Sequence, residues 1–164
     1  MAFTDDMIRA AVRTGKYTDP AAEKHVADTL IARRDAIGRS WLTNVNPVIS
    51  PALDASGTLT FANAAVDAGG AKAPTGYEVA WHTFDNATGD TKPIGQRTTS
   101  STPKVSAPAG LPTGAGSFIR ADISATGADP TWAVPVHAYF RRTASGWQWV
   151  GFNRLPDATQ KPAK

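Results

Sequence analysis

Three histidines, His25, His82 and His137, are the residues of this chain best suited to metal or proton chemistry. An imidazole can ligate a metal and can change protonation near neutral pH. The three are far apart in the sequence, and no pair shows a ligand spacing such as H-x-x-x-H. The pattern therefore favours three unrelated histidines, and we predict no metal site and no cofactor.

Other signatures of chemistry are weak. With 0 cysteines, thiol nucleophiles, zinc–thiolate sites and disulfides are excluded. Residues 85–90 carry Asp, Asn and Thr oxygens, but they do not follow the order of a calcium loop and suit a plain turn. No G-x-S-x-G elbow, phosphate-binding glycine loop or paired carboxylates stand out, so no catalytic residue is predicted.

A hydrolase-type enzyme remains one alternative. It requires at least two of five residues to converge in one cleft: His25, His82, His137, Asp122 and Arg120.

Tryptophans offer the other route to function. Trp147 and Trp149 share one face of the last predicted strand, where an exposed pair could stack on sugar rings. The opposite face is also apolar, which favours a central strand covered on both sides. Trp132 lies between two prolines and is expected to be the more exposed aromatic. A carbohydrate or small-ligand site would combine Trp132, Trp147 and Trp149 with His137 and Arg141.

The elements that position these residues change character at Asn46-Pro47. All but one of the 12 prolines and all but two of the 14 glycines lie after Val45. Before that point, Thr4 and Asp19-Pro20 are N-terminal helix signals, which predict helices over residues 5–14 and from 20 to about 43. The second helix carries an apolar face, which consists of Val26, Leu30, Ile37 and Trp41.

After Pro47 the chain alternates apolar and polar residues in short runs between turns. We predict about seven strands, over residues 58–64, 77–84, 92–99, 104–107, 117–126, 135–143 and 146–155. Short strands at this spacing point to an antiparallel β-sandwich or barrel. The predicted fold class is therefore α+β, with an N-terminal helical hairpin packed on, or leading into, an antiparallel β-sandwich, which the resemblance described below implies to be immunoglobulin-like. The predicted divisions are a two-helix segment (1–45), a linker (46–57), the sandwich (58–155) and a polar tail (156–164).

Composition limits the partners and the setting. The net charge of +3 is spread along the 164 residues, which argues against nucleic acid, and no window is apolar enough for a membrane span. The start of the chain lacks a signal-peptide pattern, so the protein is either cytoplasmic or a mature or trimmed piece of a longer one. The low charged fraction of 19% and the many small residues favour a periplasmic or secreted location.

Three segments, Thr18-Asp-Pro-Ala-Ala-Glu, Arg33-Arg34-Asp and Gly146-Trp-Gln-Trp-Val-Gly, resemble the C-terminal parts of uncharacterised multidomain bacterial envelope or secreted proteins. The strand region resembles a fibronectin-III or immunoglobulin-like sandwich, with Trp81 as the buried core tryptophan but without a Cys pair. The resemblance implies a non-catalytic accessory module and brings no functional residues with it. Its partner would be an upstream domain of the same polypeptide or another protein, docked on an exposed apolar patch of a helix.

Overall fold

The computed structural model describes residues 3–154 and begins with a pair of helices. Helix α1 spans Asp5–Arg13 and helix α2 spans Pro20–Thr43, and their N-caps are Thr4 and Asp19, as predicted. Ion pairs join the two helices, with 2.9 Å from Arg9 Nη2 to Asp28 Oδ1 and 2.7 Å from Arg34 Nη2 to Asp5 Oδ1. The helices thus form a hairpin, named here the helical arm.

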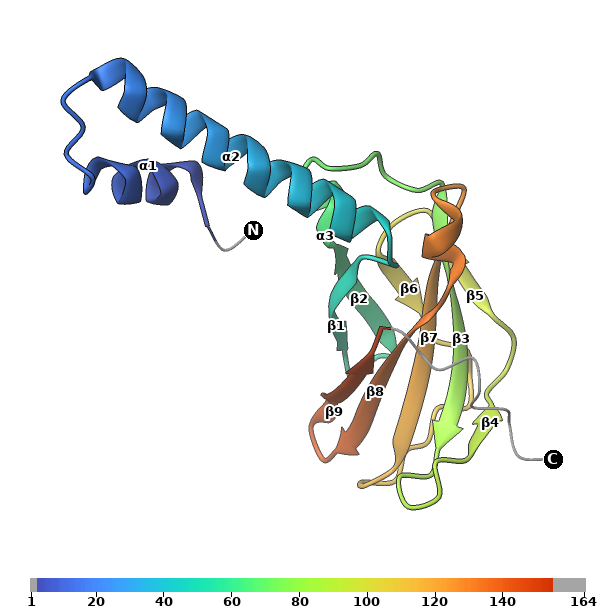
Figure 1. The fold of residues 1–164 in the computed structure, drawn as a ribbon. Coiled ribbons are helices and arrows are strands. Elements are labelled where there is room, and N and C mark those ends of the chain that lie inside the picture. Colours follow the sequence, from blue (N-terminus) through green and yellow to red (C-terminus); the bar gives the residue numbers. More distant parts are fainter. Residues whose placement is uncertain (1–2, 155–164) are drawn as a thin grey trace.

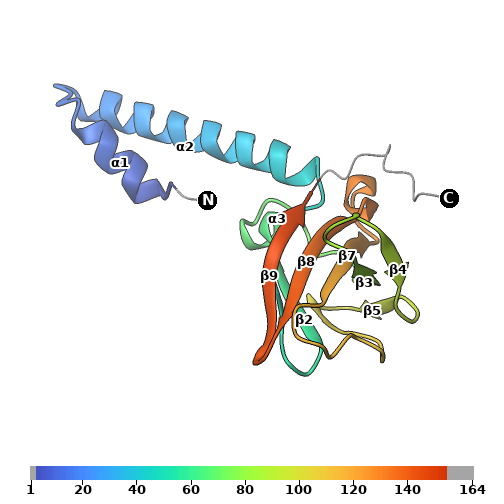
Figure 2. The same ribbon diagram turned by 90° about the horizontal axis from the view of Figure 1, so that it is seen from below.

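The helical arm projects from the β-structure, and only the C-terminal end of α2 reaches it (Figures 1 and 2). None of the helices formed by the described residues has the length and apolar character that crossing a lipid bilayer requires.

Two antiparallel sheets follow the helical arm in the chain and form a sandwich, as predicted. The smaller sheet has the order β1-β2-β6, and the larger has the order β4-β3-β7-β8-β9, with β5 also paired to β3. The strands are β1 (Val48–Leu53), β2 (Thr58–Asn63), β3 (Gly76–Phe84), β4 (Thr91–Pro93), β5 (Thr98–Ser100), β6 (Lys104–Ser106), β7 (Phe118–Thr126), β8 (Val136–Thr143) and β9 (Gly146–Asn153). A short helix, α3 (Ala64–Asp67), follows β2, and a 3-10 helix, η1 (Pro130–Ala133), precedes β8.

Three details differ from the sequence-based predictions. The predicted linker contains a strand, β1, which pairs with β2. The predicted strand over 92–99 is interrupted, because the chain turns at Gly95 with a φ of +59° between β4 and β5. Strand β9 lies at the edge of the larger sheet and is not central, because only β8 pairs with it.

The predicted turn at 85–90 is present, with Asp85 Oδ1 accepting from the Ala87 N–H at 2.8 Å. The predicted polar tail lies outside the described residues.

The core fills the space between the sheets because alternate residues of each strand point inward. Trp81 is buried there, as predicted, and its Nε1 donates to Thr98 Oγ1 at 2.8 Å. Other fully buried members are Leu59, Val79, Val105, Ile119, Ile123, Val136 and Phe140.

The junction between α2 and β1 is held by one buried side chain, Asn46. Its Nδ2 lies 2.9 Å from Ile123 O, 3.2 Å from Trp132 O and 2.9 Å from Val134 O, while its Oδ1 accepts from the Val48 N–H at 3.3 Å. The end of α2 is therefore fixed to β7 and to the segment around η1.

Candidate functional site

A cluster of polar side chains lies on the outer face of the larger sheet, on the three neighbouring strands β3, β7 and β8. The register places His82 opposite Arg120 and Asp122 opposite His137. Because residues two apart on a strand share a face, these four side chains point to the same side. We call His82, Arg120, Asp122 and His137 the polar quartet.

Asp122 is the centre of the polar quartet. Its Oδ2 lies 2.9 Å from Arg120 Nη2 and 3.5 Å from His82 Nδ1, and its Oδ1 lies 3.6 Å from His137 Nε2. Arg120 Nε approaches Oδ1 at 2.7 Å, but neither atom has an aligned hydrogen bond there. The guanidinium therefore neutralises the carboxylate, and the two imidazoles flank the pair at longer distances.

Burial governs the protonation of both histidines. The side chains of the polar quartet are only 12–19% exposed, although they lie on the outer face of the sheet. Burial lowers the pKa of His82 and of His137, the Asp122 carboxylate raises both in part, and the nearby Arg120 lowers them further. Both imidazoles are therefore neutral at pH 7.

The polar quartet is better suited to hydrogen bonding and proton exchange than to metal binding. Within the described part of the chain, no group of three or more His, Asp or Glu side chains is arranged to hold a metal ion. Arg120 occupies the carboxylate that a metal would need. A neutral His82 with its Nδ1 towards Asp122 has the orientation of a His–Asp pair, in which the remote nitrogen can accept a proton.

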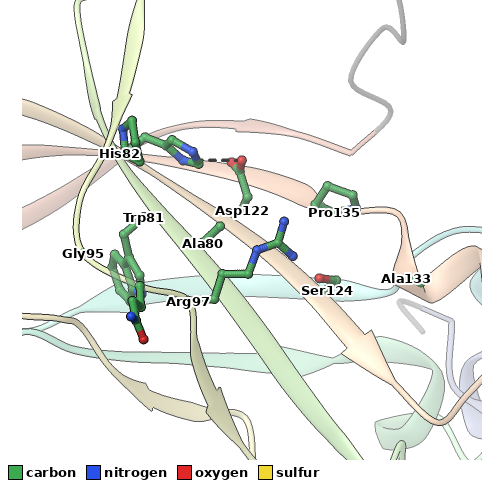
Figure 3. A pocket seen from close by; sticks show the side chains of 11 residues that line it. Ala80, Trp81, His82, Gly95, Arg97, Asp122, Ser124, Ala133 and Pro135 are labelled. Atoms are coloured by element: carbon green, nitrogen blue, oxygen red, sulfur yellow. Dashed lines mark ion pairs between the residues drawn. The ribbon is translucent and has the colours of Figure 1, made fainter.

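A pocket of about 810 Å³ gives access to this cluster (Figure 3). His82 and Asp122 lie on one side of it, and Ser124 lies further along β7. Gln96 and Arg97, from the loop between β4 and β5, form one rim, and Ala133 and Pro135, around η1, form the other. Arg97 is ion-paired with Glu78.

The structure separates the residues predicted for a ligand site. Trp132 is buried, at 2% exposure, so the prediction that it is the exposed aromatic is wrong. Its Nε1 donates to the carbonyl of Thr43 at 3.1 Å, and Thr131 Oγ1 donates to the same oxygen at 3.0 Å. The indole therefore satisfies a free carbonyl at the end of α2 instead of facing solvent.

The tryptophans of β9 and the two polar candidates lie on opposite faces of the sheet. Trp147 pairs with Arg142 and Trp149 with Phe140, which are inward-facing positions of β8, whereas His137 and Arg141 face outward. Trp147 is half-buried, with the Arg142 guanidinium 5.3 Å from its ring, while Trp149 is 47% exposed because β9 is an edge strand.

The sequence does not predict the polar quartet as a site, but its four members are among the five residues whose convergence the enzyme alternative requires. Four of the five residues in that condition converge, and His25 lies apart on α2. The available signal was the alternation of Arg120 and Asp122 on one face of a strand. This alternation does not predict the site, because local sequence does not determine which strands pair or in which register.

A second feature of interest is the exposed stripe, which consists of Leu30, Ile37 and Trp41 on α2. Their exposures are 42%, 60% and 71%. Spacings of seven and four residues place the three side chains on one face of the helix. The contact between α1 and α2 uses other residues of α2, including the buried Ala27 and Arg34.

Comparison with protein-family models, curated proteins and solved structures found no match to this chain. The polar quartet, its pocket and the exposed stripe are the features of the described residues that bear on function.

Proposed function

We propose that this chain is a non-catalytic accessory or interaction module whose helical arm docks on another folded protein domain. The observation that supports this proposal is the exposed stripe on a helix that projects from the sandwich (Figure 1). Large apolar side chains grouped on one exposed helix face are typical of interaction sites. A partner groove would take the three side chains in the manner of an amphipathic helix bound in a groove.

The partner is a domain with its own apolar groove, in the same polypeptide or in another protein. A stable interface buries about 800 Å² on each partner, which is more than three partly exposed side chains can supply. A second copy that paired through the stripe alone would fall short of this area. A groove that surrounds α2 would add its flanking charged residues, such as Arg33 and Arg39, at a polar rim.

The setting that fits this role is a larger bacterial envelope or secreted protein, with the β-structure as an immunoglobulin-like or fibronectin-III-like module. Support comes from the two antiparallel sheets, the low charged fraction of 19% and the resemblance noted above. Composition and fold support this setting only, and the proposed docking of the helical arm depends on the exposed stripe.

Photo-crosslinking tests the docking. A photoreactive amino acid at position 41, in cells that make the natural protein, should crosslink to one defined surface of another domain. The same residue at position 52, an exposed site on β1, is the matched control and should give no such product. Ile37→Ser should abolish the crosslink from position 41.

Thermal unfolding supplies the second readout. Because the stripe is exposed in the folded chain, Ile37→Ser should change the free energy of unfolding by less than about 0.5 kcal/mol. The proposal is wrong if positions 41 and 52 crosslink equally, if the product is a second copy of this chain, or if Ile37→Ser strongly destabilises the fold.

A second candidate function is small-ligand binding, and the observation that favours it is the pocket beside the polar quartet. Carbohydrate binding through tryptophans has less support, because Trp132 is buried and Trp149 lies on the other face of the sheet. The hydrolase alternative is supported by the proximity of His82 to Asp122. It predicts turnover of p-nitrophenyl esters that His82→Asn abolishes, whereas the interaction module predicts none.

A further inference from the structure

The polar quartet is unusual for the place that it occupies. Outer-face positions of a sandwich strand are normally solvated, yet these four side chains are at most 19% exposed. Burying an ion pair such as Arg120–Asp122 adds little stability compared with apolar residues of the same size. The neighbouring outer-face positions are indeed aromatic, with Phe84 and Tyr139 in edge contact at 4.8 Å. Stability alone therefore gives no reason for charges at these positions.

Three buried atoms of the polar quartet, Arg120 Nε among them, lack aligned hydrogen-bond partners. His82 Nδ1 and Asp122 Oδ1 are shielded from solvent and make no hydrogen bond of good geometry. Buried polar atoms in native proteins are normally satisfied by protein groups, ordered water or a ligand. His82 and Asp122 also line the pocket through their other atoms, so a bound molecule would lie next to this cluster (Figure 3).

Charge decides the class of ligand. Asp122 is neutralised by Arg120, Arg97 is paired with Glu78, and both histidines are neutral because burial lowers their pKa values. In this lining an anion would meet the Asp122 carboxylate, and a cation would meet the Arg97 guanidinium. The pocket has no net charge to balance either one.

The remaining lining offers both donors and acceptors. The donors are the Gln96 amide and Arg97, and the acceptors are Asp122, the Gln96 carbonyl and the neutral imidazole of His82. The Ser124 hydroxyl donates to the Glu78 carbonyl at 3.5 Å, so its oxygen is a further acceptor. A hydroxyl group uses both kinds at once. The volume of about 810 Å³ lies within the range of pockets for small molecules.

We infer that the pocket between β3, β7 and the 95–97 loop binds an uncharged, hydroxyl-rich small molecule, such as a monosaccharide or polyol. The His82–Asp122 pair and Ser124 bind hydroxyl groups at the base, and Gln96 and Arg97 bind others at the rim. The inference makes the second candidate function specific. Its failure would leave the docking of the helical arm untouched, because the exposed stripe is not part of this pocket.

NMR titration of the isotope-labelled full chain tests the inference. The imidazole signals of His82 and the amide signal of Ser124 should shift saturably with D-glucose or myo-inositol, with a millimolar Kd. Sodium acetate and choline chloride, as an anion and a cation, should not saturate the same signals. His25, on α2, is an internal reference whose imidazole signals should not move.

Variants identify the contacts. Arg97→Ala should weaken binding of the neutral probe about tenfold, since a hydrogen bond to a charged group is lost. Arg97 is exposed, so this variant should fold normally. Arg141→Ala, on the same face of the sheet but outside the pocket, is the control and should leave the Kd unchanged. No saturable shift at roughly 50 mM probe, tighter binding of acetate or choline, or equal effects of the two variants would each overturn the inference.

Discussion

Replacement of Asn46 by alanine should destabilise the protein more than most surface or loop substitutions. The Asn46 side chain is 2% exposed, and its two N–H hydrogens serve the carbonyls of Ile123, Trp132 and Val134. Removing the amide takes its donors away from the buried carbonyls of Ile123 and Trp132 and from the half-buried carbonyl of Val134. A buried polar group that loses its partner costs about 1–3 kcal/mol. The Val48 N–H also loses its acceptor. The expected loss is roughly 3–6 kcal/mol, a large share of the 5–15 kcal/mol that is usual for a domain.

Urea denaturation followed by tryptophan fluorescence measures this loss. Asn46→Asp is the sharper variant, because it keeps the size and the Val48 contact but turns a carboxylate oxygen towards the carbonyls. It should destabilise at least as much as Asn46→Ala. The control is Asn86→Ala, the same chemical change in an exposed turn, which should cost less than about 0.5 kcal/mol. A loss below about 1 kcal/mol for Asn46→Ala would show that the junction is satisfied in another way.

Two further predictions concern the pH dependence of stability and a glycine in a tight turn. Since burial lowers the pKa values of His82 and His137, the unfolded chain binds more protons, and the free energy of unfolding should fall as pH drops below about 6.5. Urea titrations from pH 8 to pH 5 should show this decrease in the free energy of unfolding. The double variant His82→Asn/His137→Asn should reduce the pH dependence. An unchanged pH dependence in the double variant would refute its assignment to the two histidines. Gly127→Ala should destabilise by roughly 1–3 kcal/mol more than Gly69→Ala. Both glycines have a positive φ, of 65° and 66°, but only at Gly127 would the new Cβ lie 2.2 Å from Thr75 Oγ1. Equal melting temperatures for the two variants would contradict this.

The sequence predicted those parts of the fold that depend on neighbouring residues. The caps at Thr4 and Asp19, the end of α2 and the positions of the last two strands, β8 and β9, all follow from residues within a few positions. The alternating pattern also predicted the inner face of β7, on which Ile119 and Ile123 are buried.

Long-range pairing explains what the sequence left unpredicted. His82 meets Asp122 only because β3 and β7 pair in one register, and a shift by one residue would turn the two side chains to opposite faces. The position of β9 at an edge likewise depends on which strands close the sheet. Trp132 was predicted to be exposed from its flanking prolines, but Pro130 begins η1, and this short helix carries the indole to the end of α2.

The segment around η1 connects the two surfaces to which functions are proposed. Thr131 and Trp132 bind the last carbonyl of α2, and the Val134 carbonyl accepts from Asn46. Within the same segment, Ala133 and Pro135 form one rim of the pocket. The base of the helical arm and the pocket wall therefore share one set of hydrogen bonds. A partner that pulled α2 out of line would have to break several buried hydrogen bonds before it moved the rim, so docking and ligand binding should be coupled only weakly. A coupling between them would require a second arrangement of η1, because a ligand shifts only a state that it binds differently.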